Sequence, residues 1–176
     1  PHLELQNTIH WIKSITLEKR GAHDTDLTAG HYKPINSPRF LHDSHEFIFH
    51  FTPHGDVPLD RTAIGVQYQD ASNVTPWNTA VTVRCRGNTW FIPYTTIQSR
   101  AKDRPHPATF PTKLPEMCLR LHGRDRIGTV ADPFLGLGST AVAAAQLGLN
   151  FVGIEMDEEY LLEAIERTRA ALAVVV

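Results

Sequence analysis

The stretch TVADPFLGLGSTAVAAAQLGLNFVGIEMD, residues 129–157, decides the fold. Two short apolar runs, Thr129 to Ala131 and Phe151 to Ile154, are typical of buried strands. Between them, the alanine-rich run from Gly138 to Leu147 predicts a helix that Gly148 ends. Strand, glycine loop, helix and strand make a βαβ unit, whose two strands we expect to be parallel with a right-handed crossover.

Two further helices flank this unit. One begins at Pro111 and ends at Gly123, and the other follows Asp157, which is placed to cap it. The expected apolar sides are Leu114, Met117, Cys118 and Leu121 in the first helix and Leu161, Ile165, Thr168 and Leu172 in the second.

The first half of the chain carries weaker signals. Thr8 to Ile12 and Glu46 to Thr52 read as strands, and the phenylalanines that alternate along the second run indicate one buried face. Residues 53–88 show no sustained periodicity and predict a long ordered loop or small insertion. We therefore expect three parts: N-terminal strands over residues 1–52, a loop-rich region over 53–105, and the βαβ portion over 106–176.

Composition sets broad limits. With 176 residues, 41% hydrophobic and 20% charged, the chain has the make-up of an ordinary globular protein. Its net charge of -2 argues against a uniformly basic nucleic-acid binder. The two cysteines form no CxxC pair, which disfavours a disulfide framework or a structural zinc site and favours a cytoplasmic setting. No apolar run is long enough to predict a membrane span.

The turn between the two strands of the βαβ unit predicts a ligand site. Open α/β sheets bind ligands beyond the carboxyl ends of their strands. Gly136 and Gly138 permit backbone angles and close ligand approach, and Glu155, at the end of the next strand, can accept hydrogen bonds from both hydroxyls of a ribose. The simpler interpretation is a turn that only packs tightly. The spacing also meets the dinucleotide fingerprint GxGxxG/A, so these residues alone leave NAD open.

Three segments together resemble the DNA amino-methyltransferases, which methylate adenine at N6 or cytosine at N4. Residues 132–140, DPFLGLGST, are similar to the motif DPFxGxGTT of that family, and residues 151–160, FVGIEMDEEY, to its FxGxExDxxY. Residues 106–114, HPATFPTKL, resemble its HPAxFPxxL segment. In dinucleotide enzymes the strand leads straight into the first glycine, whereas Asp132, Pro133 and Phe134 intervene here, as the methyltransferase pattern requires.

The resemblance implies a doubly wound, Rossmann-like α/β sheet that binds S-adenosylmethionine, of the kind found in restriction-modification systems. It implies that Glu155 holds the ribose and that the loop surrounds the methionine part. The residues assigned to the cofactor by resemblance are His106, Ala108 and Phe110 on one wall, Asp132, Phe134, Gly136 and Gly138 around the methionine part, Ser139 and Thr140 in support of the loop, and Glu155 at the ribose.

One departure from the family is large. Its catalytic tetrapeptide, Asp, Asn or Ser followed by Pro-Pro and an aromatic residue, is missing, because no Pro-Pro pair occurs in the chain. In the subgroup with this motif order the tetrapeptide lies N-terminal to the motifs seen here. We therefore expect a partial methyltransferase domain, inactive alone, that depends on a missing N-terminal portion or a second subunit. The alternative is a non-catalytic, methyltransferase-like partner subunit.

The expected macromolecular partner is double-stranded DNA. A cluster of basic residues with the aromatics Trp90 and Tyr94 among them suits a phosphate surface, although a solvated charged loop explains it equally well. The cluster consists of Arg84, Arg86, Arg100, Lys102 and Arg104. The resemblance implies that the loop-rich region over residues 53–105, which contains it, recognises DNA or the target, and that residues 106–176 bind the cofactor.

The histidines do not predict a metal site. His45, Glu46 and His50 are spaced one residue too widely for an HExxH motif. Strand alternation also places His45 and His50 on opposite faces.

Overall fold

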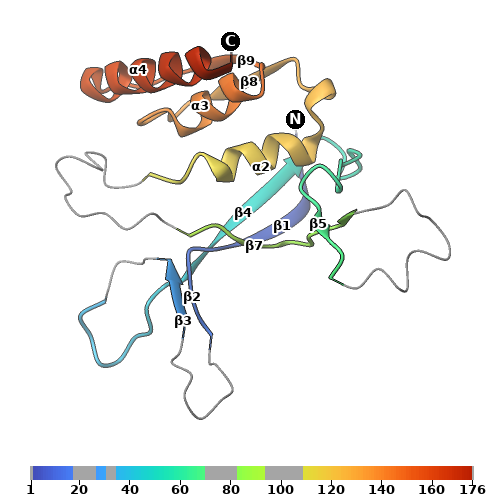
Figure 1. Cartoon of the computed structure of the whole chain (residues 1–176), viewed down its shortest axis with the longest axis vertical. Helices are drawn as coiled ribbons and strands as arrows, with labels where there is room; N and C mark the ends of the chain where they lie inside the picture. The colour runs from blue at the N-terminus through green and yellow to red at the C-terminus, as the bar shows by residue number, and fades with distance from the viewer. Residues whose placement is uncertain (1, 18–26, 31–34, 70–82, 94–108, 176) are drawn as a thin grey trace. The chain divides into compact units, whose positions relative to one another are not determined.

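The computed structural model describes residues 2–17, 27–30, 35–69, 83–93 and 109–175. The elements are drawn in Figure 1 in chain order. They are β1 Glu4–Ile12, β2 Ser14–Leu17, β3 Leu27–Gly30, β4 His45–Thr52, β5 Val66–Gln67, β6 Val83–Arg84, β7 Thr89–Phe91, α2 Lys113–His122, the 3-10 turn η1 Arg124–Arg126, β8 Thr129–Asp132, α3 Ser139–Gln146, β9 Asn150–Gly153 and α4 Glu158–Val175.

The chain forms two compact units. The first consists of Pro1–Val57 and Asn88–Pro111, and the second of Pro58–Gly87 and Thr112–Val176. The three parts expected from the sequence group residues by their role, whereas these two units group residues by their contacts. The three-part division therefore stays a prediction.

The first unit is built on a three-stranded sheet in the order β4-β1-β7. β1 pairs antiparallel with β4 and parallel with β7, and β2 and β3 form a separate antiparallel pair. Both strands predicted from the sequence are therefore confirmed. The core lies on one face of the sheet, where Ile9, Trp11 and Trp90 are buried. The indole Nε1 of Trp11 donates to the carbonyl of Ile92 at 2.8 Å, which satisfies its buried polar atom.

A bulge in β1 anchors the chain that leaves β4. The register shifts between Leu5 and Asn7, and the bulged residue is Gln6. Its Oε1 accepts hydrogen bonds from Thr52 Oγ1 at 3.0 Å and from the Val57 backbone N–H at 3.1 Å, and its Nε2 donates to the Val57 carbonyl at 2.7 Å. One amide therefore supplies the backbone of this turn with the partners that a ladder would have given it.

The phenylalanines of β4 lie on the face that does not carry this core. Phe47, Phe49 and Phe51 are exposed, whereas Ile48 and His50 on the other side of the strand are partly buried. The sequence pattern predicted one buried face, and the buried face is the one without the rings.

The second unit contains the βαβ unit that the sequence predicted. β8 and β9 pair in parallel, from Thr129 beside Asn150 to Asp132 beside Gly153, with α3 between them in sequence. Within α3, Ala143 and Ala144 are fully buried, because small side chains let the helix be covered on most sides. Leu135, Ala141 and Ala164 form a core cluster of this unit together with two partly buried side chains, Phe151 and Leu161.

The last helix begins as predicted but buries a different side. Asp157 Oδ1 accepts the backbone N–H groups of Glu159 at 3.0 Å and Tyr160 at 3.1 Å, which confirms it as the N-cap. Ile165 and Leu172 are exposed, 36% and 49%, and Ala164 is buried instead. The buried side of α4 is therefore the one that carries Leu161, Ala164 and Thr168. Ala164 lies on this side because α4 packs closely against Gly138 there.

Two other expectations are corrected or limited. Within 53–88, Val66–Gln67 and Val83–Arg84 pair as short antiparallel strands, so the segment is not purely a loop.

Of the helices that the structure describes, none is both long and apolar enough to cross a membrane. The helix expected after Pro111 is confirmed as α2, with Gly123 at its C-cap.

The two cysteines differ sharply in environment, and this leads to a test of the second unit. Burial raises the pKa of the Cys118 thiol on α2 to about 11, whereas Cys85 is exposed. The reactive form is the thiolate, so we expect Cys85 to react with a maleimide or disulfide reagent at pH 8 and Cys118 to stay protected until α2 unfolds. Time-resolved labelling with mass spectrometry measures both rates. The Cys85→Ser variant is the control and should show no fast labelling; equal rates at the two sites would contradict the burial of Cys118.

Candidate functional site

The loop between β8 and α3, residues 133–138, is held to the end of β9 by its backbone. Leu135 N–H donates to the Ile154 carbonyl and Ile154 N–H donates to the Asp132 carbonyl, both at 2.9 Å. The carboxylate of Asp132 accepts the N–H of Phe134 at 3.0 Å. These bonds turn the chain sharply at the carboxyl ends of the two strands, which is where open α/β folds bind ligands.

Glu155 connects this loop with the start of α4. Its Oε2 accepts the backbone N–H of Gly136 at 2.7 Å. Its Oε1 accepts those of Met156 at 2.9 Å and Asp157 at 3.0 Å. Charge-assisted bonds of this kind are shorter and stronger than neutral ones. The structure thus brings together Glu155 and the glycine loop, as the sequence predicted.

The two glycines of the loop serve different needs. Gly136 and Gly138 both adopt positive φ, 52° and 76°, which confirms the unusual backbone expected of them. A Cβ on Gly138 would lie 2.8 Å from the Cβ of Ala164 and 3.1 Å from its Cα. Helix α4 therefore requires a glycine at 138 in addition to the backbone angle, and the close approach of a ligand there stays a prediction.

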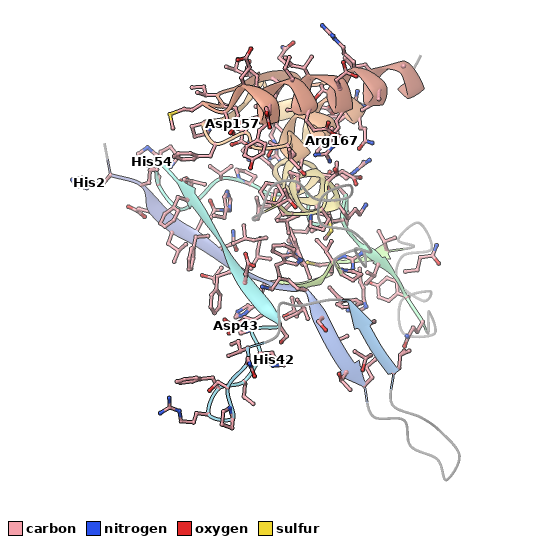
Figure 2. The ribbon with its side chains drawn as sticks, turned by 90° about the vertical axis from the view of Figure 1, so that its left-hand side faces the viewer. His2, His42, Asp43, His54, Asp157 and Arg167 are labelled. Atoms are coloured by element: carbon pink, nitrogen blue, oxygen red, sulfur yellow. The ribbon has the colours of Figure 1, made fainter. Side chains whose placement is uncertain are left out.

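Arg167 is a loop contact that the sequence analysis missed. Its Nη1 donates to the carbonyl of Leu137, within the loop. Figure 2 labels Arg167 on α4, with Asp157 at the start of that helix. The signal that could have identified Arg167 is its spacing of three from Ala164, which puts both residues on the same side of α4.

The charge around the loop is negative. Asp132, Glu155 and Asp157 lie at its ends, and no lysine or arginine occurs between Arg126 and Arg167. Helix α3, which the loop opens, has no acidic residue in its first turn and no side-chain cap. A pyrophosphate placed here would face these carboxylates, and the guanidinium of Arg167 is already bonded to the Leu137 carbonyl, so hydroxyl groups and a cation would be favoured.

Two exposed apolar side chains lie next to the carboxylates of the loop. Phe134 and Met156 are 89% and 97% exposed and follow directly on Asp132–Pro133 and Glu155. Ser139 is buried at the first position of α3, and Thr140 beside it is partly buried. Apolar side chains next to carboxylates suit a ligand with an aromatic ring and a hydroxylated sugar.

The other predicted site residues belong to one or the other unit or fall outside the described residues. Phe110 belongs to the first unit and is 36% exposed. Arg84 and Arg86 are exposed in the second unit, and Arg86 Nε donates to the Ile64 carbonyl at 3.0 Å. Trp90 is buried in the first unit, so it is wrong as an aromatic of a DNA-facing surface. The remaining predicted residues, His106 and Ala108 of the cofactor wall and Arg100, Lys102 and Arg104 of the basic cluster, lie outside the described residues, as does Tyr94.

No group of three metal-binding side chains occurs within the described parts of the chain. The two histidines of β4 that prompted the question lie on opposite faces. His45 packs its ring edge-on against Phe47, with centroids 5.2 Å apart, whereas His50 Nδ1 lies 3.1 Å from Asn7 Nδ2.

A family described as DNA methylase matches this chain over residues 2–166. The type II methyltransferase M.BglI of Bacillus subtilis is 40% identical over 72 residues, which are 41% of this chain and 19% of that protein. The type II methyltransferase M.SmaI of Serratia marcescens is 44% identical over 62 residues, 35% of this chain and 21% of that protein. The matches to these relatives thus span about a fifth of their length.

Two solved structures share the fold. The M1.HpyAVI–SAM complex has a TM-score of 0.56 and 21% identity, and the match covers 94% of this chain and 62% of that one. The PvuII DNA methyltransferase (cytosine-N4-specific) has a TM-score of 0.60 and 17% identity, with 98% and 56% covered. The Rossmann-like α/β fold expected from the sequence is thereby confirmed, as a part of a longer fold.

The contact between Gly138 and Ala164 gives a second test. In Gly138→Ala, the added methyl group meets α4 and the residue must keep a positive φ, so we expect the free energy of unfolding to fall by about 1 to 3 kcal/mol. Gly128→Ala is the matched control, because a Cβ there meets nothing within 4 Å and its φ is not positive. Chemical denaturation measures both variants. Equal stability of the two would show that α4 does not approach the loop as described.

Proposed function

Because the chain belongs to the DNA methylase family, whose model matches residues 2–166, we propose that it is the cofactor-binding part of a DNA methyltransferase. The proposed reaction transfers a methyl group from S-adenosylmethionine to the exocyclic amine of adenine, at N6, or of cytosine, at N4. The observation that carries the proposal is the carboxylate-bound glycine loop, with Glu155 at its centre and no basic side chain between Arg126 and Arg167.

The loop residues fit the cofactor by their chemistry. S-Adenosylmethionine, when bound, supplies a methyl group on a positively charged sulfur, and it carries a ribose with two hydroxyls. The Glu155 carboxylate, held at the end of the loop, is the kind of acceptor that these hydroxyls require, and Asp132 supplies negative charge beside the loop. Phe134, Gly136, Gly138, Ser139 and Thr140 would border the methionine part. Phe110, with His106 and Ala108, would supply the other wall in the same proposal.

The same chemistry argues against the dinucleotide alternative. NAD carries a pyrophosphate, which dinucleotide sites bind with the backbone N–H groups at a helix N-terminus. In this chain two carboxylates already occupy donors around the bend, Asp132 at Phe134 N–H and Glu155 at Gly136 N–H. Placing two further negative charges beside them would cost free energy.

The acceptor base needs residues that this chain does not contain. No Pro-Pro pair occurs in the sequence, so the tetrapeptide that would hold the flipped base and its amine must come from elsewhere. We propose that a preceding segment of a longer protein, or a second subunit, supplies it, and that residues 1–176 alone do not methylate DNA. The missing Pro-Pro pair also fits the alternative proposal, in which the chain is a non-catalytic partner subunit.

DNA contacts belong to this proposal as well. Arg84 and Arg86 are exposed, and with Arg100, Lys102 and Arg104 they would bind backbone phosphates of double-stranded DNA. A cytoplasmic location, favoured by the two free cysteines, is part of the same proposal.

The cofactor proposal is tested at Glu155. Both of its oxygens accept backbone N–H groups, so the amide of Glu155→Gln must turn an NH₂ group toward one of these donors. Hydrogen bonds to a charged group contribute about 1.5 to 3 kcal/mol, so we expect S-adenosylmethionine to bind roughly 10- to 100-fold more weakly by calorimetry. Glu158→Gln, at an exposed position three residues on, is the matched control and should bind normally. Tighter binding of NAD than of S-adenosylmethionine would refute the assignment.

The DNA proposal is tested at Arg84. If its guanidinium neutralises one phosphate, Arg84→Ala should lower the slope of log affinity against log salt concentration by about 0.9. Fluorescence anisotropy with a DNA duplex over a range of salt concentrations measures the slope. Arg169→Ala, an exposed arginine on α4, serves as the control. An unchanged slope for Arg84→Ala would remove this residue from the DNA surface.

A further inference from the structure

Helix α4 makes a polar contact with the glycine loop that the carboxylates of the site do not explain. Nη1 of Arg167 donates to the carbonyl of Leu137. The side chain of Arg167 is partly buried, and Leu137 is buried. Arg167 is also the first basic residue after Arg126 in the sequence. The loop therefore contacts a cationic donor as well as the acidic residues at its ends.

This contact fixes one peptide unit of the loop. Gly138 N–H donates to the Leu135 carbonyl at 3.0 Å, which closes a turn whose second residue, Gly136, has a positive φ of 52°. The carbonyl of Leu137 and the N–H of Gly138 belong to the same planar peptide unit. Arg167 binds its carbonyl and Leu135 binds its N–H, so this unit cannot rotate without breaking one of the two hydrogen bonds.

The fixed peptide unit lies directly before helix α3. Gly138 is the N-cap of α3, and its own carbonyl accepts the N–H of Val142 at 2.9 Å. The orientation of the peptide before the N-cap sets the direction in which the loop enters the helix. Arg167 therefore acts at the joint between the loop and α3.

Close packing brings Arg167 to this joint. Gly138 has no side chain to hold α4 away at Ala164, and Arg167 follows Ala164 by three positions on the same side of the helix. One position further, Thr168 Oγ1 donates to the Ala164 carbonyl at 2.7 Å. The turn of α4 that contacts the loop thus carries a side-chain hydrogen bond of its own.

The guanidinium is bonded to the loop although a carboxylate is available on its own helix. Glu163 precedes Arg167 by four positions, a spacing at which Glu and Arg commonly pair. Glu116 and Arg120 form such a pair on α2, at 2.7 Å. Among the described residues, Arg167 makes no ion pair with Glu163. Its bond to the loop is therefore not a by-product of an ion pair on the surface of α4.

We propose that Arg167 is a positioning residue for the cofactor, which holds the peptide between Leu137 and Gly138 in the orientation that binding of the methionine part requires. This inference rests on the proposed function. A loop that is fixed before the ligand arrives loses less conformational entropy on binding, so the contact raises affinity without touching the ligand. Arg167 acts through the position of the loop and not through its charge, because a free cation would repel the sulfonium of S-adenosylmethionine.

Two variants separate position from charge. Arg167→Lys keeps the charge, but its side chain is shorter and lacks the planar guanidinium, so the contact is lost. Arg167→Met removes charge and donors and keeps an apolar stem. We expect both variants to bind S-adenosylmethionine about tenfold more weakly, the loss expected for one charge-assisted hydrogen bond. Arg169→Met, at an exposed position of the same helix, is the matched control and should bind like the wild type.

Calorimetry on protein expressed from its natural genetic locus measures these affinities, with circular dichroism to show that each variant is folded. S-Adenosylhomocysteine is the second ligand, because it lacks the methyl group and the positive charge on sulfur. A shift in the position of the loop weakens both ligands by the same factor, whereas a charge effect changes their ratio. If Arg167→Met does not fold, Arg167→Lys alone decides. Wild-type affinity in Arg167→Lys, or a changed ratio in Arg167→Met, would overturn the proposal.

Hydrogen exchange of the ligand-free protein tests the loop itself. The N–H of Gly138 should exchange faster in both Arg167 variants and at the wild-type rate in Arg169→Met, because its bond to Leu135 is then no longer supported. Unchanged exchange at Gly138 would overturn the positioning role even if affinity fell. A wild-type protein that binds neither ligand refutes the proposed function and this role together. Wild-type binding that both variants retain in full refutes the role of Arg167 alone.

Discussion

The hydrogen bonds of the Glu155 carboxylate hold the candidate site together. One oxygen accepts the N–H of Gly136 in the glycine loop, and the other accepts the N–H groups of Met156 and Asp157, just before α4. The carboxylate therefore connects the loop, the end of a strand and the entry to α4 through three charge-assisted bonds. A loop held in this way needs little further ordering when a ligand binds, which lowers the entropic cost of binding.

The βαβ unit could be predicted from the sequence because its signals are local. Glycines at 136, 138 and 148 mark the ends of the elements, and Asp157 marks the start of α4, so boundaries and pairing followed from short stretches. What could not be predicted depends on how the elements approach one another. The buried side of α4 is set by its contact with Gly138, and Arg167 acts through a carbonyl that is 30 residues away in sequence.

The first unit shows a different limit. A strand such as β4, with aromatic residues at every second position and apolar or polar residues between them, does not tell which face the core occupies. The core is decided by Trp11 and Trp90, which are 79 positions apart and are neighbours across β1 and β7. Two-residue strands such as Val66–Gln67 have no periodicity at all, so they escape any pattern in the sequence.

Charge is segregated along the chain in a way that suits two different ligands. The loop between β8 and α3 sits in a stretch without lysine or arginine from 127 to 166, while Arg84 and Arg86 are exposed in a segment outside it. Carboxylates at the loop would attract the cationic sulfonium of the proposed cofactor and repel phosphate, so a DNA backbone would be kept away from the loop. Under the proposed function, only a base that has left the duplex could then reach the methyl group, and the residues that hold such a base must approach the loop from another polypeptide segment.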